Sequence, residues 1–242
     1  MAKSKSKERD LIEKLPRRHR ENMRGRSEGA LGMAEAVAAL KRFKGTKFDQ
    51  TVEICLHLGI DPRQADQAIR GSIALPSGIG RTKRVVAFCP PEKVDDATGA
   101  GAVEAGGEEL VARIEKGWME FDVAVATPDM MRVISKLGRV LGPKGLMPSP
   151  KAGTVTPDVA RAVGEYSAGK VEYRNDKGGN VHAPIGKMSF SEVDLLANLE
   201  HFVKTIEGLR PSSVKGQYIK KIAISGTMTP SVLVEIPSTT VA

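Results

Sequence analysis

The sequence predicts a two-domain α/β protein in which an open α/β domain is inserted into a discontinuous α+β domain. Residues 75–165 alternate short apolar runs with helical segments, which is the rhythm of βα units. The flanking segments contain alternating strands and amphipathic helices, and neither flank alone can bury its apolar face. Combined, they predict a split-βαβ domain whose sheet has antiparallel character. We therefore expect a basic N-terminal extension (1–30), a discontinuous domain (31–74 with 166–242) and an inserted Rossmann-like domain (75–165).

Two apolar runs in the inserted region predict strands that are buried on both faces. They are RVVAFC at 84–89 and DVAVA at 122–126. Helices are predicted around them at 108–117, at 128–137 (capped by Thr127 and stopped by Gly138) and at 157–166 (capped by Thr156).

The flanking segments predict a half-covered sheet. Residues 50–58 (QTVEICLHL) alternate in polarity, which predicts a strand with one buried face. We expect Val52, Ile54, Leu56 and Leu58 to point inward, and Thr51, Glu53, Cys55 and His57 to lie on the other face. Further strands are predicted at 170–175, 180–186, 217–225 and 231–236, with a glycine-containing turn at 176–180. Helices are predicted at 33–43 and at 191–209, the latter burying Leu195, Leu199, Phe202, Ile206 and Leu209.

The positive charge of the chain is concentrated at one end. The net charge is +8 at pH 7, which favours an anionic partner. Residues 1–30 hold 10 basic and 5 acidic side chains, whereas residues 75–165 hold 12 of each. Taken alone, this distribution fits a nucleic-acid contact and a merely solvated extension equally well.

Composition also indicates the compartment. The two cysteines, Cys55 and Cys89, form no CxxC motif, so a reduced cytosolic protein is expected. No apolar run reaches the roughly 18 residues that a spanning helix needs, so no membrane partner is expected. The basic N-terminus lacks the apolar segment of a secretory signal.

Motifs for catalysis or cofactor binding are missing from the sequence. GxGxxG does not occur between a strand and a helix, Lys144 is followed by Gly-Leu rather than by the Ser or Thr of a phosphate loop, and GxSxG does not occur. The four histidines lack partners at metal-ligand spacing, so neither a metal nor a cofactor is expected. Cys55 and His57 share a strand face, but a half-buried cysteine beside a surface imidazole is the commoner arrangement. An enzyme is not expected, so a binding function is predicted, and the positive net charge favours a nucleic acid as the ligand.

The type of RNA binding can be narrowed from the aromatic content. Ten aromatic residues are few, and the aromatic run of a sheet that stacks bases is missing. A basic protein without stacking platforms is expected to contact phosphates, 2′-hydroxyls and folded shape, so structured RNA is the predicted ligand.

A glycine- and proline-rich stretch, KLGRVLGPKGLMPSPKAGTV at 136–155, carries four basic residues and no acid. Glycine and proline together specify backbone shape, so the stretch serves either as a phosphate cradle or as a stiff connector. We expect it to close the inserted α/β domain. A second hypothesis gives Arg139, Lys144 and Lys151 transient contacts with RNA.

The same stretch resembles the large-subunit ribosomal protein L-one family (bacterial type), the protein of the mobile stalk. The resemblance extends from about Met33 to Ile236. It is carried, in order, by KFDQTVEICLHLGIDPRQADQAIRG, DVAVATPDMM with GRVLGPKGLMPSPKAGT, VEYRNDKGGNVHAPIGK and GTMTPSVLVEI. The family's second domain is inserted into its first, which agrees with the domain split predicted above.

The resemblance implies an RNA-binding surface on the discontinuous domain. The family's contacts lie where the strand after the first helix meets the segment before the last strand. By resemblance these are Lys47, Phe48, Thr51, Glu53, Thr227, Met228 and Thr229. Thr229 is a departure, because the family usually has glycine there, which admits RNA close to the backbone. Without the resemblance, Phe48 and Met228 would be interpreted as core residues. Secondary phosphate contacts are expected at Lys170, Arg174, Lys177 and Lys187.

The implied function is that of a non-enzymatic component of the large ribosomal subunit. By resemblance, its partners are 23S rRNA, exit-site tRNA, its own operon mRNA and other large-subunit components, all in the cytoplasm. Two alternatives stay open: a free-standing RNA-binding regulator, and a nucleotide-binding enzyme built on the inserted domain.

Overall fold

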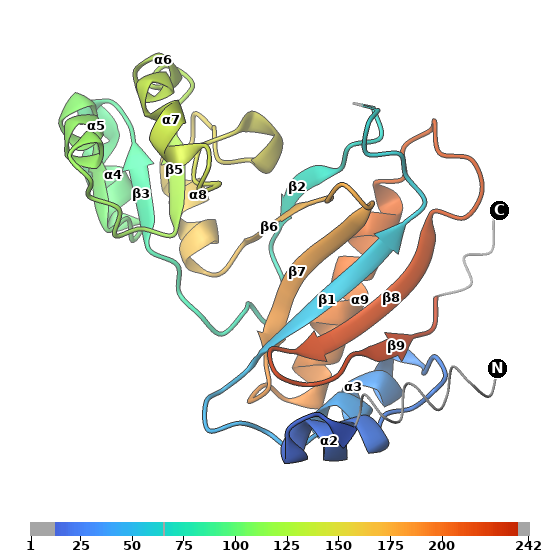
Figure 1. Ribbon diagram of the computed structural model, residues 1–242. Helices are drawn as coiled ribbons and strands as arrows, with labels where there is room; N and C mark the ends of the chain where they lie inside the picture. Colours follow the sequence, from blue (N-terminus) through green and yellow to red (C-terminus); the bar gives the residue numbers. More distant parts are fainter. Residues whose placement is uncertain (1–12, 65, 237–242) are drawn as a thin grey trace. The chain divides into compact units, whose positions relative to one another are not determined.

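The computed structural model describes residues 13–64 and 66–236 (Figure 1). Contacts divide the chain into two compact units. The first contains the described residues up to Ile69 and from Asn175 onward, and the second contains Arg70–Arg174. The predicted domain boundaries differ by several residues at each crossing, and they stay a prediction.

The first unit is built on a four-stranded antiparallel sheet in the order β7-β1-β8-β9. Helices α3 and α9 pack against each other and against this sheet (Figure 1). The bounds are α2 Arg17–Arg24, α3 Met33–Lys41, β1 Thr51–Leu58, β7 Asn180–Lys187, α9 Glu192–Gly208, β8 Ile219–Gly226 and β9 Val232–Val234.

The predicted inward face of β1 is confirmed. Val52, Ile54, Leu56 and Leu58 are each at most 1% exposed, whereas the residues between them are exposed or half-buried. Because side chains alternate along a strand, the opposite face of β1 is the one that carries polar groups.

Helix α9 covers the buried face of this sheet. The Ser191 side chain caps it by accepting a hydrogen bond from the Asp194 backbone N–H at 3.1 Å. The predicted stripe is fully buried at Leu195, Leu199, Phe202 and Ile206. Leu209 does not belong to it, because the helix ends at Gly208 and the Leu209 side chain is 46% exposed.

The second unit contains a three-stranded parallel sheet in the order β4-β3-β5. All four residues of β3 and of β5 are buried, as predicted for strands covered on both faces. The bounds are β2 Arg70–Ile73, β3 Val85–Phe88, η1 Pro91–Lys93, α4 Val94–Gly99, β4 Glu104–Gly106, α5 Glu108–Glu115, β5 Val123–Ala126, α6 Met131–Ile134, η2 Ser135–Leu137, α7 Gly138–Leu141, η3 Pro150–Ala152, α8 Val159–Ser167 and β6 Val171–Arg174.

Alternate residues of β3 enter two separate cores. Val85 and Ala87 pack with α4 and α8, while Val86 and Phe88 pack with α5, α6 and α7. The sheet is therefore the middle layer of a three-layer α/β unit.

Three local predictions in this unit were wrong. The helix predicted at 128–137 is broken into short pieces, and Gly138 begins α7 instead of ending a helix. Thr127 is buried and caps no helix, because Met131 is the first residue of α6. Asp158, not Thr156, caps α8 by accepting from the Arg161 N–H at 3.1 Å.

The strands on either side of the 176–180 turn do not form the hairpin that their spacing suggests. β6 pairs with β2 instead, with Gly71 opposite Tyr173. The two sides of the turn are linked by an isolated bridge between Asn175 and Val181 and by hydrogen bonds between Asp176 and Asn180. The chain thus passes from the two-stranded β2–β6 sheet to β7 of the four-stranded sheet within a few residues.

Tyr166 on α8 gives the second unit a pH-dependent stability. Its phenol donates a hydrogen bond to the Ala152 carbonyl at 2.6 Å, and burial raises the pKa of Tyr166 to about 12. Since this pKa lies above the ordinary value near 10, the neutral phenol stabilises the fold below about pH 10, and this contribution is lost as the pH rises through about 12.

Between pH 10 and 12, the unfolding free energy of wild type should fall by up to about 2–3 kcal/mol more than that of Tyr166→Phe. Urea denaturation at each pH measures this, and parallel pH profiles would contradict it.

Candidate nucleic-acid interface

Two segments that are far apart in the sequence meet at one end of the four-stranded sheet. Val52 of β1 is paired with Gly226 of β8. The Thr227 backbone N–H then donates to the Thr51 carbonyl at 3.0 Å, and the Thr51 N–H donates to the Thr227 hydroxyl at 3.2 Å. The beginning of β1 and the 226–229 turn therefore lie side by side and form one continuous edge at this end of the sheet, across the strand ends.

Gln50 strengthens this junction. Its side chain is buried, at 1% exposed, and its amide oxygen accepts the Met228 backbone N–H at 2.8 Å. Its own carbonyl accepts the Met188 N–H at 2.9 Å. One residue thus ties the start of β1 to both the 226–229 turn and the segment after β7.

The outward side of this edge presents two apolar side chains among polar ones. Phe48 is 54% exposed and Met228 is 50% exposed, so neither belongs to the core. Lys47, Glu53 and Thr227 are exposed beside them. We call this set, with Thr51 and Thr229, the edge surface.

Lys187 belongs with the edge surface. It lies opposite Thr51 in the β1–β7 register, and its ammonium donates to the Thr51 hydroxyl at 2.9 Å. Because that bond uses a lone pair of the hydroxyl oxygen, the Thr51 O–H stays free to donate to a ligand.

Of the other secondary candidates, Lys170 and Arg174 belong to the second unit and Lys177 to the first. Lys170 lies in the second unit, where it pairs with Glu165 at 2.6 Å and lies 5.4 Å from the centre of the Tyr166 ring. Arg174 is exposed at the end of β6, and Lys177 is exposed in the turn before β7. Since β7 is an eight-residue strand, Lys177 is roughly 25 Å from the end that carries Lys187.

The glycine- and proline-rich stretch is integrated into the second unit. The Ala126 backbone N–H donates to the Thr154 carbonyl at 2.8 Å, so the end of the stretch lies alongside β5. Leu146 and Met147 pack onto the core beside it, in keeping with the predicted closing role. Arg139, Lys144 and Lys151 are exposed on its surface.

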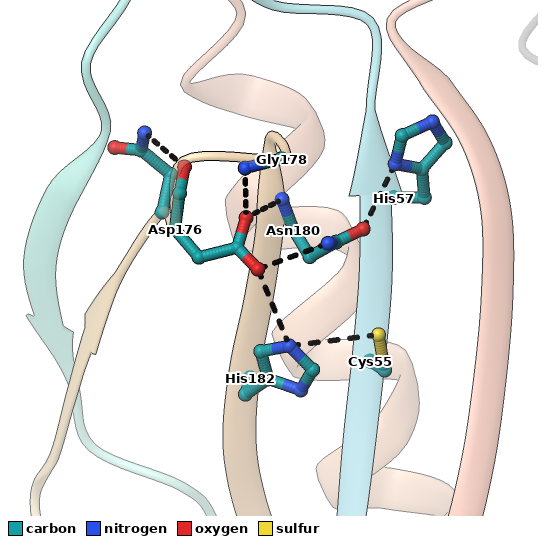
Figure 2. Close-up of polar contacts among 7 residues, drawn as sticks. Cys55, His57, Asp176, Gly178, Asn180 and His182 are labelled. Atoms are coloured by element: carbon teal, nitrogen blue, oxygen red, sulfur yellow. Dashed lines mark hydrogen bonds and ion pairs between the residues drawn. The ribbon is translucent and has the colours of Figure 1, made fainter. Parts of the chain in front are cut away.

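A polar cluster on the outward face of the first unit bears on the enzyme alternative (Figure 2). Asp176 accepts the backbone N–H groups of Gly178 and Asn180 at 2.8 and 2.7 Å, and bonds from Asn180 hold the pKa of Asp176 below its usual value. His57 bonds to the Asn180 side chain at 2.8 Å rather than to Cys55. These bonds organise the turn that begins β7.

The thiol in this cluster lies beside an imidazole but is held in its unreactive form. The Nε2 atom of His182 is 4.0 Å from the Cys55 sulfur. Burial, together with the Asp176 charge, raises the pKa of the Cys55 thiol. Since the thiolate is the reactive form, the raised pKa weighs against covalent catalysis here.

In the part of the chain that the structure describes, no group of three His, Cys, Asp or Glu residues lies close enough to hold a metal ion. None of the helices within 13–64 and 66–236 has the length and apolar character needed to cross a membrane.

The model of the ribosomal protein L1p/L10e family matches residues 40–230, which is most of the chain. The chain belongs to this family. The L1p/L10e proteins are RNA-binding components of the large ribosomal subunit and not a family of enzymes. Both segments of the edge surface fall inside the region that matches the family, whereas α2 falls outside it.

Thr229 stabilises the turn that carries Met228. Its hydroxyl accepts the Gly226 N–H at 2.8 Å, and its own N–H donates to the Gly226 carbonyl at 3.1 Å. The hydroxyl of this unusual threonine is thus directed into the turn.

Replacing Thr229 by valine should lower the free energy of unfolding by about 1 kcal/mol, because the Gly226 N–H loses its partner. Thr229→Ser keeps the hydroxyl and should lie closer to wild type. Urea denaturation of the three proteins provides the comparison, and equal values for the serine and valine variants would count against this role.

Proposed function

We propose that this L1p/L10e protein binds 23S rRNA in the mobile stalk of the large subunit through the edge surface, and helps deacylated tRNA leave the exit site. The observation that supports the proposal is the junction of β1 with the 226–229 turn, which brings Phe48 and Met228 to the surface of one unit. A cytoplasmic location on the ribosome, in contact with other large-subunit components, follows from the same proposal.

The side chains of the edge surface suit folded RNA. Lys47 supplies a cation for a phosphate, and the Thr51 and Thr227 hydroxyls are within the reach of ribose 2′-hydroxyls that approach this edge. Glu53 is exposed on the same strand face and is suited to accept from a 2′-hydroxyl or an exocyclic amine. Phe48 and Met228 would exclude water from these hydrogen bonds.

A filter-binding titration tests the RNA proposal. The full chain should bind a large-subunit RNA fragment that contains the stalk base, and it should cosediment with large subunits at moderate salt. A chain that binds the fragment but never cosediments would be a free-standing regulator. Failure to bind any large-subunit fragment would overturn the proposal. Stabilisation against thermal unfolding by millimolar nucleotide would instead favour the enzyme alternative.

Repression of the protein's own operon mRNA is proposed for the same surface. If one surface serves both RNAs, Phe48→Ala should weaken binding to the operon mRNA and to the rRNA fragment by similar factors. Loss of rRNA binding with intact mRNA binding would show that the two RNAs use different sites.

The exposed cations of the glycine- and proline-rich stretch are proposed as additional, transient RNA contacts. Replacing Arg139, Lys144 and Lys151 with alanine should reduce the slope of log affinity against log salt by up to about two to three units, because each cation that contacts a phosphate releases roughly one counterion. Filter binding over a salt series measures the slope. An unchanged slope would leave the stretch with its structural role alone.

A further inference from the structure

Helix α2 carries a stripe of arginines. Its sequence is RRHRENMR. Arg17, Arg20 and Arg24 follow one another at spacings of three and four residues, so they lie along one face of the helix. Arg17 and Arg24 are exposed and Arg20 is half-buried, whereas Asn22, on another face, is only 4% exposed.

The helix is attached to the segment that leads into the edge surface. The Asn22 amide accepts the Lys44 backbone N–H at 2.8 Å and donates to the Lys44 carbonyl at 3.2 Å. Lys44 also forms an ion pair with Glu21. Phe48 is four positions after Lys44, a distance of at most about 14 Å along the chain. The arginine stripe is therefore held close to the edge surface.

The acid on this helix pairs with Lys44 and with one arginine of the stripe, Arg17, which leaves Arg20 and Arg24 outside these ion pairs. Hydrogen bonds from Lys44 and Arg17 keep the pKa of Glu21 below its usual value, so its charge is matched locally. Across residues 17–47 the chain has nine basic side chains and three acidic ones. The basic side chains lie in two groups, at 17–26 and at 41–47, and the Asn22–Lys44 hydrogen bonds bring these two segments together.

The surface of α2 suits an anionic polymer better than a protein partner. Among the described residues, the large apolar side chains that are exposed include none from α2, so this helix lacks the apolar centre of a protein interface. Arginine, in contrast, forms strong paired hydrogen bonds with phosphate oxygens. Phosphate contacts set the register of a bound nucleic acid while its sequence or shape is recognised elsewhere.

We infer that the arginine stripe of α2 contacts the phosphates of the same RNA that the edge surface binds, and so extends the interface beyond the region that matches the family. This inference rests on the proposed function, because it assigns a second contact to that ligand. In this arrangement the arginine stripe contributes binding affinity for the RNA and the salt dependence of that affinity. The edge surface recognises the folded RNA.

The test replaces Arg17, Arg20 and Arg24 with glutamine, which removes charge but favours helix almost equally. A matched control replaces three exposed lysines of the same unit, Lys204, Lys215 and Lys220. Lys220 lies at the end of β8 away from Gly226, and Lys204 lies three turns into α9. The probe is the large-subunit RNA fragment that wild type binds, titrated by filter binding over a salt series.

The arginine variant should bind about tenfold more weakly at 0.1 M salt, and its salt slope should fall by about two units. The lysine control should keep a slope close to that of wild type. Arg24→Glu, tested separately, should weaken binding in the same direction. A wild-type slope in the arginine variant, or an equal loss in the lysine control, would overturn the inference.

The failures of the two proposals can be told apart with one further protein, the Phe48→Ala/Met228→Ala double variant. If wild type does not bind the fragment, the proposed function fails. If wild type binds, the double variant loses affinity and the arginine variant retains both affinity and slope, only the role of α2 fails.

Discussion

Replacing both Phe48 and Met228 with alanine should lower the affinity for the large-subunit RNA fragment about a hundredfold, with little loss of stability. Each side chain is about half exposed, so truncation opens no large cavity and the free energy of unfolding should change by less than about 1 kcal/mol. The affinity loss, about 2.7 kcal/mol, is what two central apolar contacts of an interface contribute when they exclude water from neighbouring hydrogen bonds.

A matched control separates the edge surface from apolar exposure in general. Leu209 is 46% exposed in the same unit, just past the end of α9 away from Ser191. Leu209→Ala should therefore bind RNA like wild type. Equal affinity of the double variant and wild type, with both proteins folded, would show that the edge surface does not bind the RNA fragment.

Gln50→Ala should weaken both the fold and RNA binding, although Gln50 is not itself exposed. The substitution leaves the Met228 N–H without its buried acceptor, and the loss of a buried hydrogen-bond partner costs about 1–3 kcal/mol of unfolding free energy. Since the same bond holds the 226–229 turn against β1, the affinity for the RNA fragment should fall about tenfold, or about 1.4 kcal/mol.

Two measurements distinguish this positioning role from simple destabilisation. Gln217→Ala removes an exposed glutamine before the far end of β8 and should change neither quantity. At a temperature where Gln50→Ala is fully folded, its affinity should still be reduced. Normal affinity under that condition would limit Gln50 to a role in stability.

The layers of the fold follow from patterns that are local in the sequence. The alternation of residues 50–58 identified the buried face of β1, because strand geometry allows only two faces. The continuous apolar runs identified β3 and β5 in the same way. The pairing of β6 with β2 was not predictable from turn chemistry, because its partner is about 100 residues away in the chain.

The candidate site depended on the family resemblance more than on residue patterns. Exposure of Phe48 and Met228 contradicts the ordinary expectation for large apolar side chains, and nothing in their local sequence indicates it. Gln50 was missed, although a signal was present: it has the same parity as Val52 and Ile54, so the alternation places this polar group on the inward face. A buried amide needs partners, and that requirement points to a junction.

Two further features depend on contacts that sequence alone does not specify. Lys170, whose phosphate contact stays a prediction, pairs with Glu165, which lies five residues earlier in α8. The arginines of α2 belong to a basic segment whose charge is also compatible with a solvated extension. The structure shows that α2 is not a free extension, because two hydrogen bonds between Asn22 and Lys44 attach that helix to the first unit.

Site-directed cross-linking tests the central claim most directly. A photoreactive phenylalanine analogue is placed at Phe48 in one protein and at Met228 in another, and each protein is irradiated with the large-subunit RNA fragment. We expect cross-links from both positions to neighbouring nucleotides of a single folded site, because Thr51 and Thr227 are hydrogen-bonded to each other between them. Cross-links to separate RNA regions, or none from either position while the RNA stays bound, would show that these two residues do not form one RNA-binding surface.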